Sequence, residues 1–285
     1  MVDGPLRLIL ESPHHTVWIG IEKHIGKHIM DNPMSLEDRV VIITGAAQGV
    51  GRGVAKKAGE LGAKLALVDL NEEGAQETAD MIDGDVTVYT GSVAEPGFVQ
   101  ETVAAVIEKH GRINGLFNNA GIIRTAMIHK MSVADWQAVI DVNLTGVFHC
   151  LQAVGRHMIE RVQQGDDSPN RIVNVSSVAG RKGTIGQINY GAAKSGVLGI
   201  TMSAAREWAR YGVCVNSVCF GVVETPMTEV IRSPKFAERT MSGIPMGRVT
   251  TPSEVAGPCC FLLSDTASYV TGQHLNIDGG SHIGF

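Results

Sequence analysis

The sequence predicts a single doubly wound α/β fold with a parallel sheet of about seven strands. Short apolar runs alternate with longer segments of helical periodicity, which is the pattern of strands joined by crossover helices. The apolar runs are rich in Val, Ile and Leu, as expected of strands that helices cover on both faces. Right-handed crossovers follow for such units. A chain of 285 residues, 44% of them hydrophobic, is long enough to bury the core of this fold.

Each element is predicted from its local pattern. The short apolar runs predict strands over 40–44, 65–68, 86–90, 115–117, 171–176, 213–218 and 274–277. The helical patterns between them cover 51–61, 72–82, 98–110, 133–161 with a possible break, 190–211 and 252–263. Residues 163–170 predict a polar surface loop. Residues 222–248 show neither the helical nor the strand periodicity. A long irregular connection beside an active site is often a lid, so this stretch is the predicted substrate lid.

Composition excludes several classes of protein. The formal net charge of −5 gives no indication of a nucleic-acid surface. No apolar run approaches the roughly 20 residues of a membrane helix, so no membrane partner is expected. The five cysteines form no paired CxxC pattern, so no metal site is expected. Their odd number and the lack of a secretory signal favour a reducing, cytoplasmic location.

Residues 1–35 are interpreted separately from the alternating α/β pattern of residues 36–285, which form the predicted main domain. They form an N-terminal extension of uncertain order, which contains irregularly spaced histidines and short apolar runs. A flexible tail, an extra packing arm and upstream sequence translated from a wrong start are all compatible with it. Met34 opens a natural-looking beginning just before the first strand.

A glycine-rich turn follows the first strand. Gly45, Gly49 and Gly51 lie in a G-x-x-x-G-x-G pattern that also contains Gln48, directly before the first helix. Glycines allow the backbone to turn tightly and to approach a pyrophosphate, and a helix N-terminus offers free N–H groups. The placement after strand one predicts a dinucleotide site, although glycine-rich turns also arise from loop geometry alone.

Asp69 ends the second strand. An acidic residue at this point of a dinucleotide fold accepts hydrogen bonds from the adenosine ribose hydroxyls and repels the extra phosphate of NADP. Position 48 is Gln and offers no positive charge, although Arg52 is near in sequence. NAD is therefore predicted in preference to NADP. After the fourth strand, the small residues of Asn119-Ala120-Gly121 leave room for the cofactor, or form an ordinary turn.

Three residues could carry the chemistry. Tyr190 and Lys194 are four residues apart on a predicted helix and therefore share a face. An ammonium near a phenol favours the phenolate and lowers its pKa, which suits Tyr190 to act as a base. Ser177 lies 13 residues upstream, where its hydroxyl could bind a substrate oxygen. Strand alternation directs the neighbouring Ser176 to the opposite face.

These motifs together resemble the short-chain dehydrogenase/reductase family, with the 3-oxoacyl-carrier-protein reductases as the most similar subgroup. The resemblance runs from about residue 36 to residue 280. It rests on the glycine turn, Asn118-Asn119-Ala120-Gly121, Val142-Asn143-Leu144, Ser177, Tyr190-Gly191-Ala192-Ala193-Lys194, and Tyr269-Val270-Thr271-Gly272 with Asp278-Gly279-Gly280.

The resemblance implies roles for the matching positions. Tyr190 would exchange a proton with the substrate oxygen, and Lys194 would lower its pKa and bind the nicotinamide ribose. Ser177 would position the carbonyl, and Asn143 would hold a water that links Lys194 to solvent. The residues implied to contact the cofactor are Gly45, Gln48, Gly49, Val50, Gly51, Asp69, Leu70, Ser92, Val93, Asn119, Ala120, Gly121, Tyr190, Lys194, Gly221, Val223 and Thr225.

Two positions depart from the family pattern. Phe220-Gly221 stands where the family usually has Pro-Gly, so Phe220 could reshape the wall near the nicotinamide, while Thr225 remains for the carboxamide. Ser92-Val93 stands where an Asp often contacts adenine, which predicts a different contact there. The substrate pocket is expected to include Ser177, Tyr190, the lid, and the further residues Val178, Ile185 and Gln187.

The predicted function is hydride transfer between NAD(H) and a secondary alcohol or ketone. An NADPH-dependent 3-oxoacyl-thioester reductase is one alternative, and a catalytically silent dinucleotide-binding sensor is another. By resemblance, a homotetramer is expected to form through the helices 133–161 and 190–211, with a dimer left open.

Overall fold

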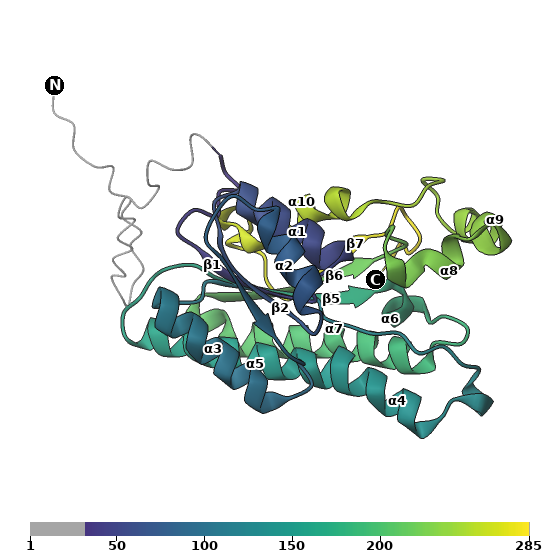
Figure 1. The fold of residues 1–285 in the computed structure, drawn as a ribbon, viewed down its shortest axis with the longest axis horizontal. Helices are drawn as coiled ribbons and strands as arrows, with labels where there is room; N and C mark the ends of the chain where they lie inside the picture. The colour runs from purple at the N-terminus through teal and green to yellow at the C-terminus, as the bar shows by residue number, and fades with distance from the viewer. Residues whose placement is uncertain (1–31, 285) are drawn as a thin grey trace, which may run out of the picture. The chain divides into compact units, whose positions relative to one another are not determined.

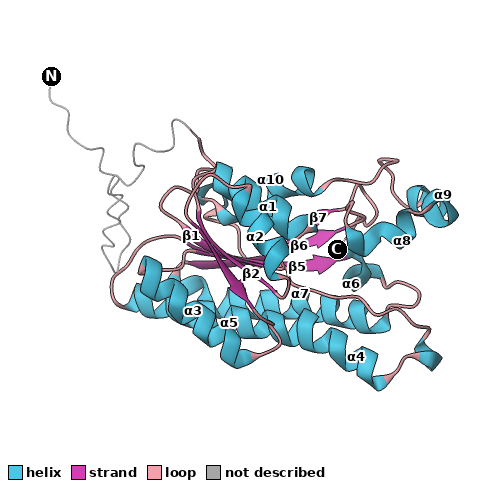
Figure 2. Cartoon of the chain, in the orientation of Figure 1, coloured by secondary structure: helices cyan, strands magenta, loops and turns pink. Residues whose placement is uncertain are grey.

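The computed structural model describes residues 32–284, so most of the predicted extension 1–35 lies outside the described residues. Residues 34–284 belong to one compact unit. Its centre is a seven-stranded parallel sheet in the order β3-β2-β1-β4-β5-β6-β7 (Figures 1 and 2). The order reverses between β1 and β4, the switch point at which open α/β sheets bind ligands. The predicted fold class is confirmed.

The strands are β1 Val40–Thr44, β2 Lys64–Asp69, β3 Val86–Thr90, β4 Gly115–Asn118, β5 Asn170–Ser177, β6 Val213–Phe220 and β7 His274–Ile277. The helices are α1 Gly49–Glu60, α2 Glu72–Asp80, α3 Pro96–His110, α4 Val133–Ile140, α5 Gly146–Gln163, α6 Val178–Lys182, α7 Ile188–Trp208, α8 Glu229–Arg232, α9 Pro234–Ser242 and α10 Pro252–Leu263. The predicted elements recur, some with identical ends and the others with ends moved by at most three residues.

Two hydrophobic cores lie on the two faces of the sheet, because successive strand side chains alternate between faces. Val41 and Ile43 of β1 belong to the core under α1 and α10, whereas Val40 and Ile42 belong to the core under α3 and α5. Figure 1 shows α1, α2 and α10 on one side of the sheet and α3, α5 and α7 on the other. A strand buried on both faces has to be apolar at every position, which is why β1 reads as a continuous apolar run.

The break predicted within 133–161 is present. Residues Asp141–Thr145 form a π-helical turn between α4 and α5, and such turns widen a helix locally and often occur at functional sites. The continuous helical run Val133–Gln163 is long and apolar enough to count as a candidate membrane span, contrary to the expectation from the sequence. Its buried side chains, such as Cys150, Leu151 and Val154, pack in the core under the sheet, and a core helix passes the same test.

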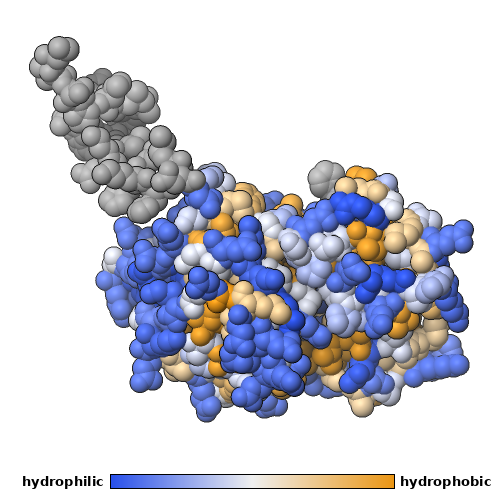
Figure 3. All heavy atoms as spheres, turned by 45° about the horizontal axis from the view of Figure 1, so that its top comes forward, coloured by the Kyte–Doolittle hydropathy of each residue, from blue (hydrophilic) through white to orange (hydrophobic). Residues whose placement is uncertain are grey.

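The predicted lid is partly helical. It contains the short helices α8 and α9, and neither of them has a buried residue. The five cysteines are all free and buried. On the face drawn in Figure 3, hydrophilic residues predominate and the hydrophobic ones form separate areas between them.

Candidate active site

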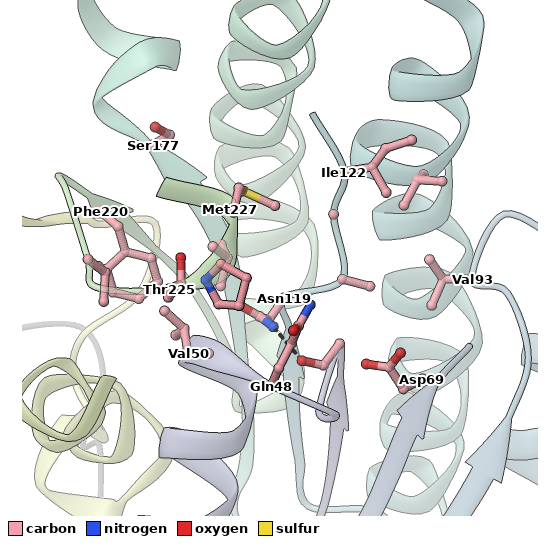
Figure 4. Close-up of a pocket in the computed structure, with 18 of the residues that line it drawn as sticks. Gln48, Val50, Asp69, Val93, Asn119, Ile122, Ser177, Phe220, Thr225 and Met227 are labelled. Carbon is pink, nitrogen blue, oxygen red and sulfur yellow. Dashed lines mark hydrogen bonds between the residues drawn. The ribbon is translucent and has the colours of Figure 1, made fainter. Parts of the chain in front are cut away.

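A cleft of about 340 Å³ opens at the carboxyl ends of the strands. It extends along the sheet edge, and Figure 4 shows Asp69 at one end and Ser177 with Phe220 toward the other. Its lining combines the glycine turn, the ends of the central strands and the first residues of the lid. The switch point of the sheet and the cleft therefore coincide, as this fold class requires of a ligand site.

The glycine turn at the start of α1 is closely packed against the chain. Gly45 and Gly49 have positive φ angles of 67° and 55°, which only glycine adopts without strain. A Cβ at Gly51 would lie 2.0 Å from the Gly45 carbonyl oxygen, so no side chain fits there. The first N–H groups of α1 have no partner within the helix, and Gly49 and Val50 at its start line the cleft, as expected of a pyrophosphate site. The glycine turn thus lies in the cleft, where the sequence predicts a dinucleotide site.

Asn119 connects the fourth strand to this turn. Its Nδ2 donates to the carbonyl oxygens of Thr44 at 3.0 Å and Gly45 at 3.1 Å. The Thr44 hydroxyl in turn accepts from the backbone N–H groups of Asn119 and Ala120. These bonds hold the two loops of the switch point in one arrangement, so Asn119 stabilises the cleft as well as lining it.

Asp69 lines the other end of the cleft and shapes the turn. One of its carboxylate oxygens accepts from the Ala47 N–H at 2.9 Å, and the other accepts from the Asn71 N–H at 3.0 Å. Arg52, the nearest candidate for a phosphate-binding cation, is already engaged. Its guanidinium donates to the Thr78 hydroxyl at 2.9 Å and forms an ion pair with Glu77 at 2.9 Å.

Ser177, Tyr190 and Lys194 come together at the reacting end of the cleft. Ser177 ends β5 and caps α6, where its hydroxyl accepts from the Ala179 N–H at 3.1 Å. The Ser176 hydroxyl donates instead to the Lys194 carbonyl on the other face, as strand alternation predicts. The Lys194 ammonium lies 5.7 Å from the centre of the Tyr190 ring and donates to the Val175 carbonyl at 2.8 Å.

Burial controls the protonation of this pair. It lowers the pKa of Lys194 from 10.5 to about 8. It raises the pKa of Tyr190 above its usual 10, and the hydrogen bond with Ser177 opposes that rise. Burial is thus the largest influence on the pKa of Tyr190 in the protein alone, and the lowering by Lys194 that the sequence argument expects stays a prediction.

Asn143 does not line the cleft. It is buried in the π-helical turn, where its Oδ1 accepts from the Ile122 N–H and its Nδ2 donates to the Ile122 carbonyl, both at 2.9 Å. Ile122 does line the cleft, together with Val142. Asn143 thus holds one wall of the site in place from behind.

The sequence-predicted set overlaps the cleft with few exceptions. The predicted residues that line it are Gly45, Gln48, Gly49, Val50, Asp69, Leu70, Ser92, Val93, Asn119, Ala120, Gly121, Ser177, Tyr190, Lys194, Gly221, Val223 and Thr225. The predicted residues outside its lining are Gly51, Asn143, Val178, Ile185 and Gln187. Lining residues that sequence reasoning missed are Val68, Gly91, Ile122, Val142, Val175 and Ser176. Most of these residues are apolar or glycine and carry no chemical signature, so only their positions beside strand ends could have indicated them.

Comparison with known proteins gives the same class. Residues 45–282 match the family model described as enoyl-(acyl carrier protein) reductase. The chain is 44% identical over 250 residues to the 3-oxoacyl-[acyl-carrier-protein] reductase FabG of Thermotoga maritima, covering 87% of this chain and 99% of that protein. It is 38% identical to the acetoacetyl-CoA reductase of Synechocystis sp., covering 87% and 98%. Levodione reductase superposes with a TM-score of 0.81 at 36% identity, covering 86% and 97%.

The fold and the site define a nicotinamide-dinucleotide-dependent oxidoreductase. The chain belongs to the short-chain dehydrogenase/reductase family, within its FabG-like part. A further structural neighbour, a putative 2-deoxy-d-gluconate 3-dehydrogenase from Agrobacterium tumefaciens with bound NADP, has 34% identity and a TM-score of 0.80, covering 88% of this chain and 98% of that one.

Proposed function

We propose that this oxidoreductase interconverts a secondary alcohol and a ketone with NAD(H), using Tyr190 as the acid and base. The observation that carries the proposal is the cleft itself. It joins the glycine turn and Asp69 at one end to Ser177, Tyr190 and Lys194 at the other. A dinucleotide that follows the cleft brings its reactive ring to the group that can exchange a proton.

Each residue has a separate task in this proposal. When bound, the nicotinamide supplies or accepts the hydride. Tyr190 exchanges a proton with the substrate oxygen, and Ser177 donates a hydrogen bond to that oxygen. Lys194 binds the nicotinamide ribose and stabilises the phenolate as it forms. Asn143 keeps the Ile122 wall in position, and we expect it to hold the water that links Lys194 to solvent.

Asp69 supports NAD over NADP. A 2′-phosphate on the adenosine ribose would meet a carboxylate that already accepts two backbone hydrogen bonds. Arg52 could offset that repulsion only by giving up its bonds to Thr78 and Glu77. Asp69→Asn keeps the size of the side chain and removes the charge, so it is expected to narrow the preference for NAD. Turnover of the wild-type protein with NADP alone would refute this assignment.

A second candidate is an NADPH-dependent 3-oxoacyl-thioester reductase. It is favoured by the activities in the names of the FabG relatives and of the acetoacetyl-CoA reductase. Initial rates with both cofactors on acetoacetyl-CoA, steroids and polyols separate the candidates. The exposed side chains of Met227 and Met246 fit a lid over residues 222–248 that adapts to the substrate.

The central test replaces Tyr190 by Phe, which removes one oxygen atom. Turnover is expected to fall by about 10²–10⁴-fold, the usual contribution of a positioned acid or base. The affinity for NADH, measured by its fluorescence, is expected to stay within about twofold, because the ring remains. Tyr211→Phe is the matched control, since Tyr211 follows α7 outside the cleft. Near-normal turnover of the Tyr190 variant would overturn the mechanism.

The expected assembly and location complete the proposal. Phe148 on α5 and Met202 on α7 are exposed apolar side chains on the two helices expected to join subunits. They support a homotetramer, which sedimentation analysis tests directly. Free, buried cysteines are compatible with a cytoplasmic protein.

A further inference from the structure

Asn189 directly precedes Tyr190 and is the second residue of α7. It is fully buried, and a buried side-chain amide has to find hydrogen-bond partners. Its Oδ1 accepts from the Tyr190 N–H at 2.8 Å. Its Nδ2 donates to the carbonyl oxygens of Arg124 and Asp135, both at 3.1 Å, and lies 3.5 Å from the Met131 sulfur. One side chain thus joins the start of α7 to the segment after β4 and to α4.

The start of α7 depends on this side chain. The first four N–H groups of a helix have no partner within it, and a side chain at the N-cap often binds one of them. Gln187, the residue at the N-cap of α7, makes no such bond. Asn189 supplies an acceptor from inside the first turn, for the N–H of Tyr190 itself. The backbone of Tyr190 is therefore bound to a side chain whose other end is fixed outside α7.

The segment after β4 forms one wall of the cleft. Ile122 lines the cleft, and Asn143 binds both its N–H and its carbonyl at 2.9 Å. Four residues later, the Ala126 N–H donates to the Gly186 carbonyl at 2.9 Å, just before α7. The bond from Asn189 reaches the wall between these two points. The wall is thus held to the π-helical turn at one end and to the start of α7 at the other, in one arrangement.

We propose that Asn189 is a positioning residue, which sets the distance of the Tyr190 hydroxyl from a substrate held against the Ile122 wall. This inference rests on the proposed function of Tyr190 as the acid and base. Asn189 does not line the cleft, so it acts through Tyr190 and touches neither cofactor nor substrate. A misplacement of about 1 Å at a reacting group can lower the rate about 10²-fold. A tether on the backbone of Tyr190 therefore affects the proton transfer that its hydroxyl performs.

The test compares Asn189→Ala, which removes every bond, with Asn189→Asp. The Asp side chain keeps the size and the acceptor for the Tyr190 N–H, but a carboxylate donates to neither the Arg124 nor the Asp135 carbonyl. Turnover is measured with acetoacetyl-CoA and NADH or, where the wild type converts it faster, with another member of the same substrate and cofactor panel. Both variants are expected to lower kcat by about 10- to 100-fold, while KM and the affinity for NADH change by less than about threefold.

A second measurement separates positioning from a loss of folded protein. If Asn189 acts through the Tyr190 hydroxyl, Asn189→Ala lowers the residual turnover of a Tyr190→Phe protein by less than about twofold, whereas the losses multiply if its role is only structural. The matched control is Asn216→Ala. Asn216 is equally buried outside the cleft, and its amide donates to the Val270 carbonyl at 2.7 Å and accepts from the Gln273 N–H at 3.0 Å. This control is expected to lower the melting temperature similarly and to keep turnover within about twofold.

The outcomes separate this inference from the proposed function. A wild type that converts no member of the panel overturns both. An active wild type whose Asn189 variants keep kcat within about twofold, or whose double variant shows multiplied losses, overturns the role of Asn189 and leaves the proposed function standing. If thermal melting shows that Asn189→Ala does not fold, Asn189→Asp takes its place in both measurements and decides.

Discussion

Replacing Lys194 by Met should change the pH dependence of folding in a way that the structure predicts with its sign. Burial lowers the pKa of Lys194 from 10.5 to about 8. Below pH 8 the folded protein therefore carries a buried charge that the unfolded chain exposes to water. At 1.36 kcal/mol for each pKa unit, the cost to stability is about 3 kcal/mol. The Lys194 bond to the Val175 carbonyl offsets about 1 kcal/mol of this.

At pH 7 Lys194→Met is thus expected to be inactive and about 2 kcal/mol more stable than the wild type. Between pH 8 and 10.5 the unfolded chain holds more protons than the folded one, so the wild type gains stability relative to the variant as pH rises. By pH 9.5 the difference in free energy of unfolding between the variant and the wild type should therefore have shrunk by about 2 kcal/mol. Urea denaturation of both proteins at several pH values measures this difference. The other titratable groups are the same in both proteins, so their contributions to the pH dependence cancel. A stability difference that stays flat or moves the other way would refute the reasoning.

Two further predictions concern the turn and a buried ion pair. Gly51→Ala adds a Cβ 2.0 Å from the Gly45 oxygen, so NADH affinity should fall by more than about tenfold and stability by about 1–3 kcal/mol. Gly257→Ala, in α10 with nothing within 4 Å, is the control and should not destabilise. Asp166→Ala leaves the buried Arg161 without its carboxylate and should cost about 1–3 kcal/mol at pH 7. The pKa of Asp166 is lowered to about 2, mainly by Ser168, so the melting temperatures of wild type and variant should converge between pH 4 and 2.

The sheet could be predicted because burial on both faces requires a continuous apolar run, and the runs at β1 and β2 have no other simple explanation. The end of β6 was less predictable. The predicted strand stopped at Val218, whereas the structure extends it to Phe220. Phe220 stands where the family usually has proline. Because a phenylalanine retains the backbone N–H that a proline lacks, Phe220 can still take part in the strand.

The chemistry of the site could be predicted where a residue's type and position together suggest one chemical role, as with Asp69 at a strand end or Tyr190 four residues before Lys194. Its energetics could not. The sequence argument used the charge of Lys194 to lower the pKa of Tyr190, but the loss of water around both groups depends on tertiary packing. The apolar wall formed by Ile122 and Val142 was missed for a related reason, because packing alone brings it to the cleft.

The two halves of the cleft differ in how firmly the protein holds them. In the cofactor half, Asn119 and Asp69 are already bonded to backbone groups, so a dinucleotide meets polar groups whose positions are set before it binds. In the substrate half, α8 and α9 have no buried residues, and little apolar contact stabilises them in one place. Residues that set a fixed polar framework are constrained in type and can be recognised in a sequence. Residues of a weakly packed lid are free to vary with the substrate, which is why the sequence indicates the cofactor class far better than the substrate.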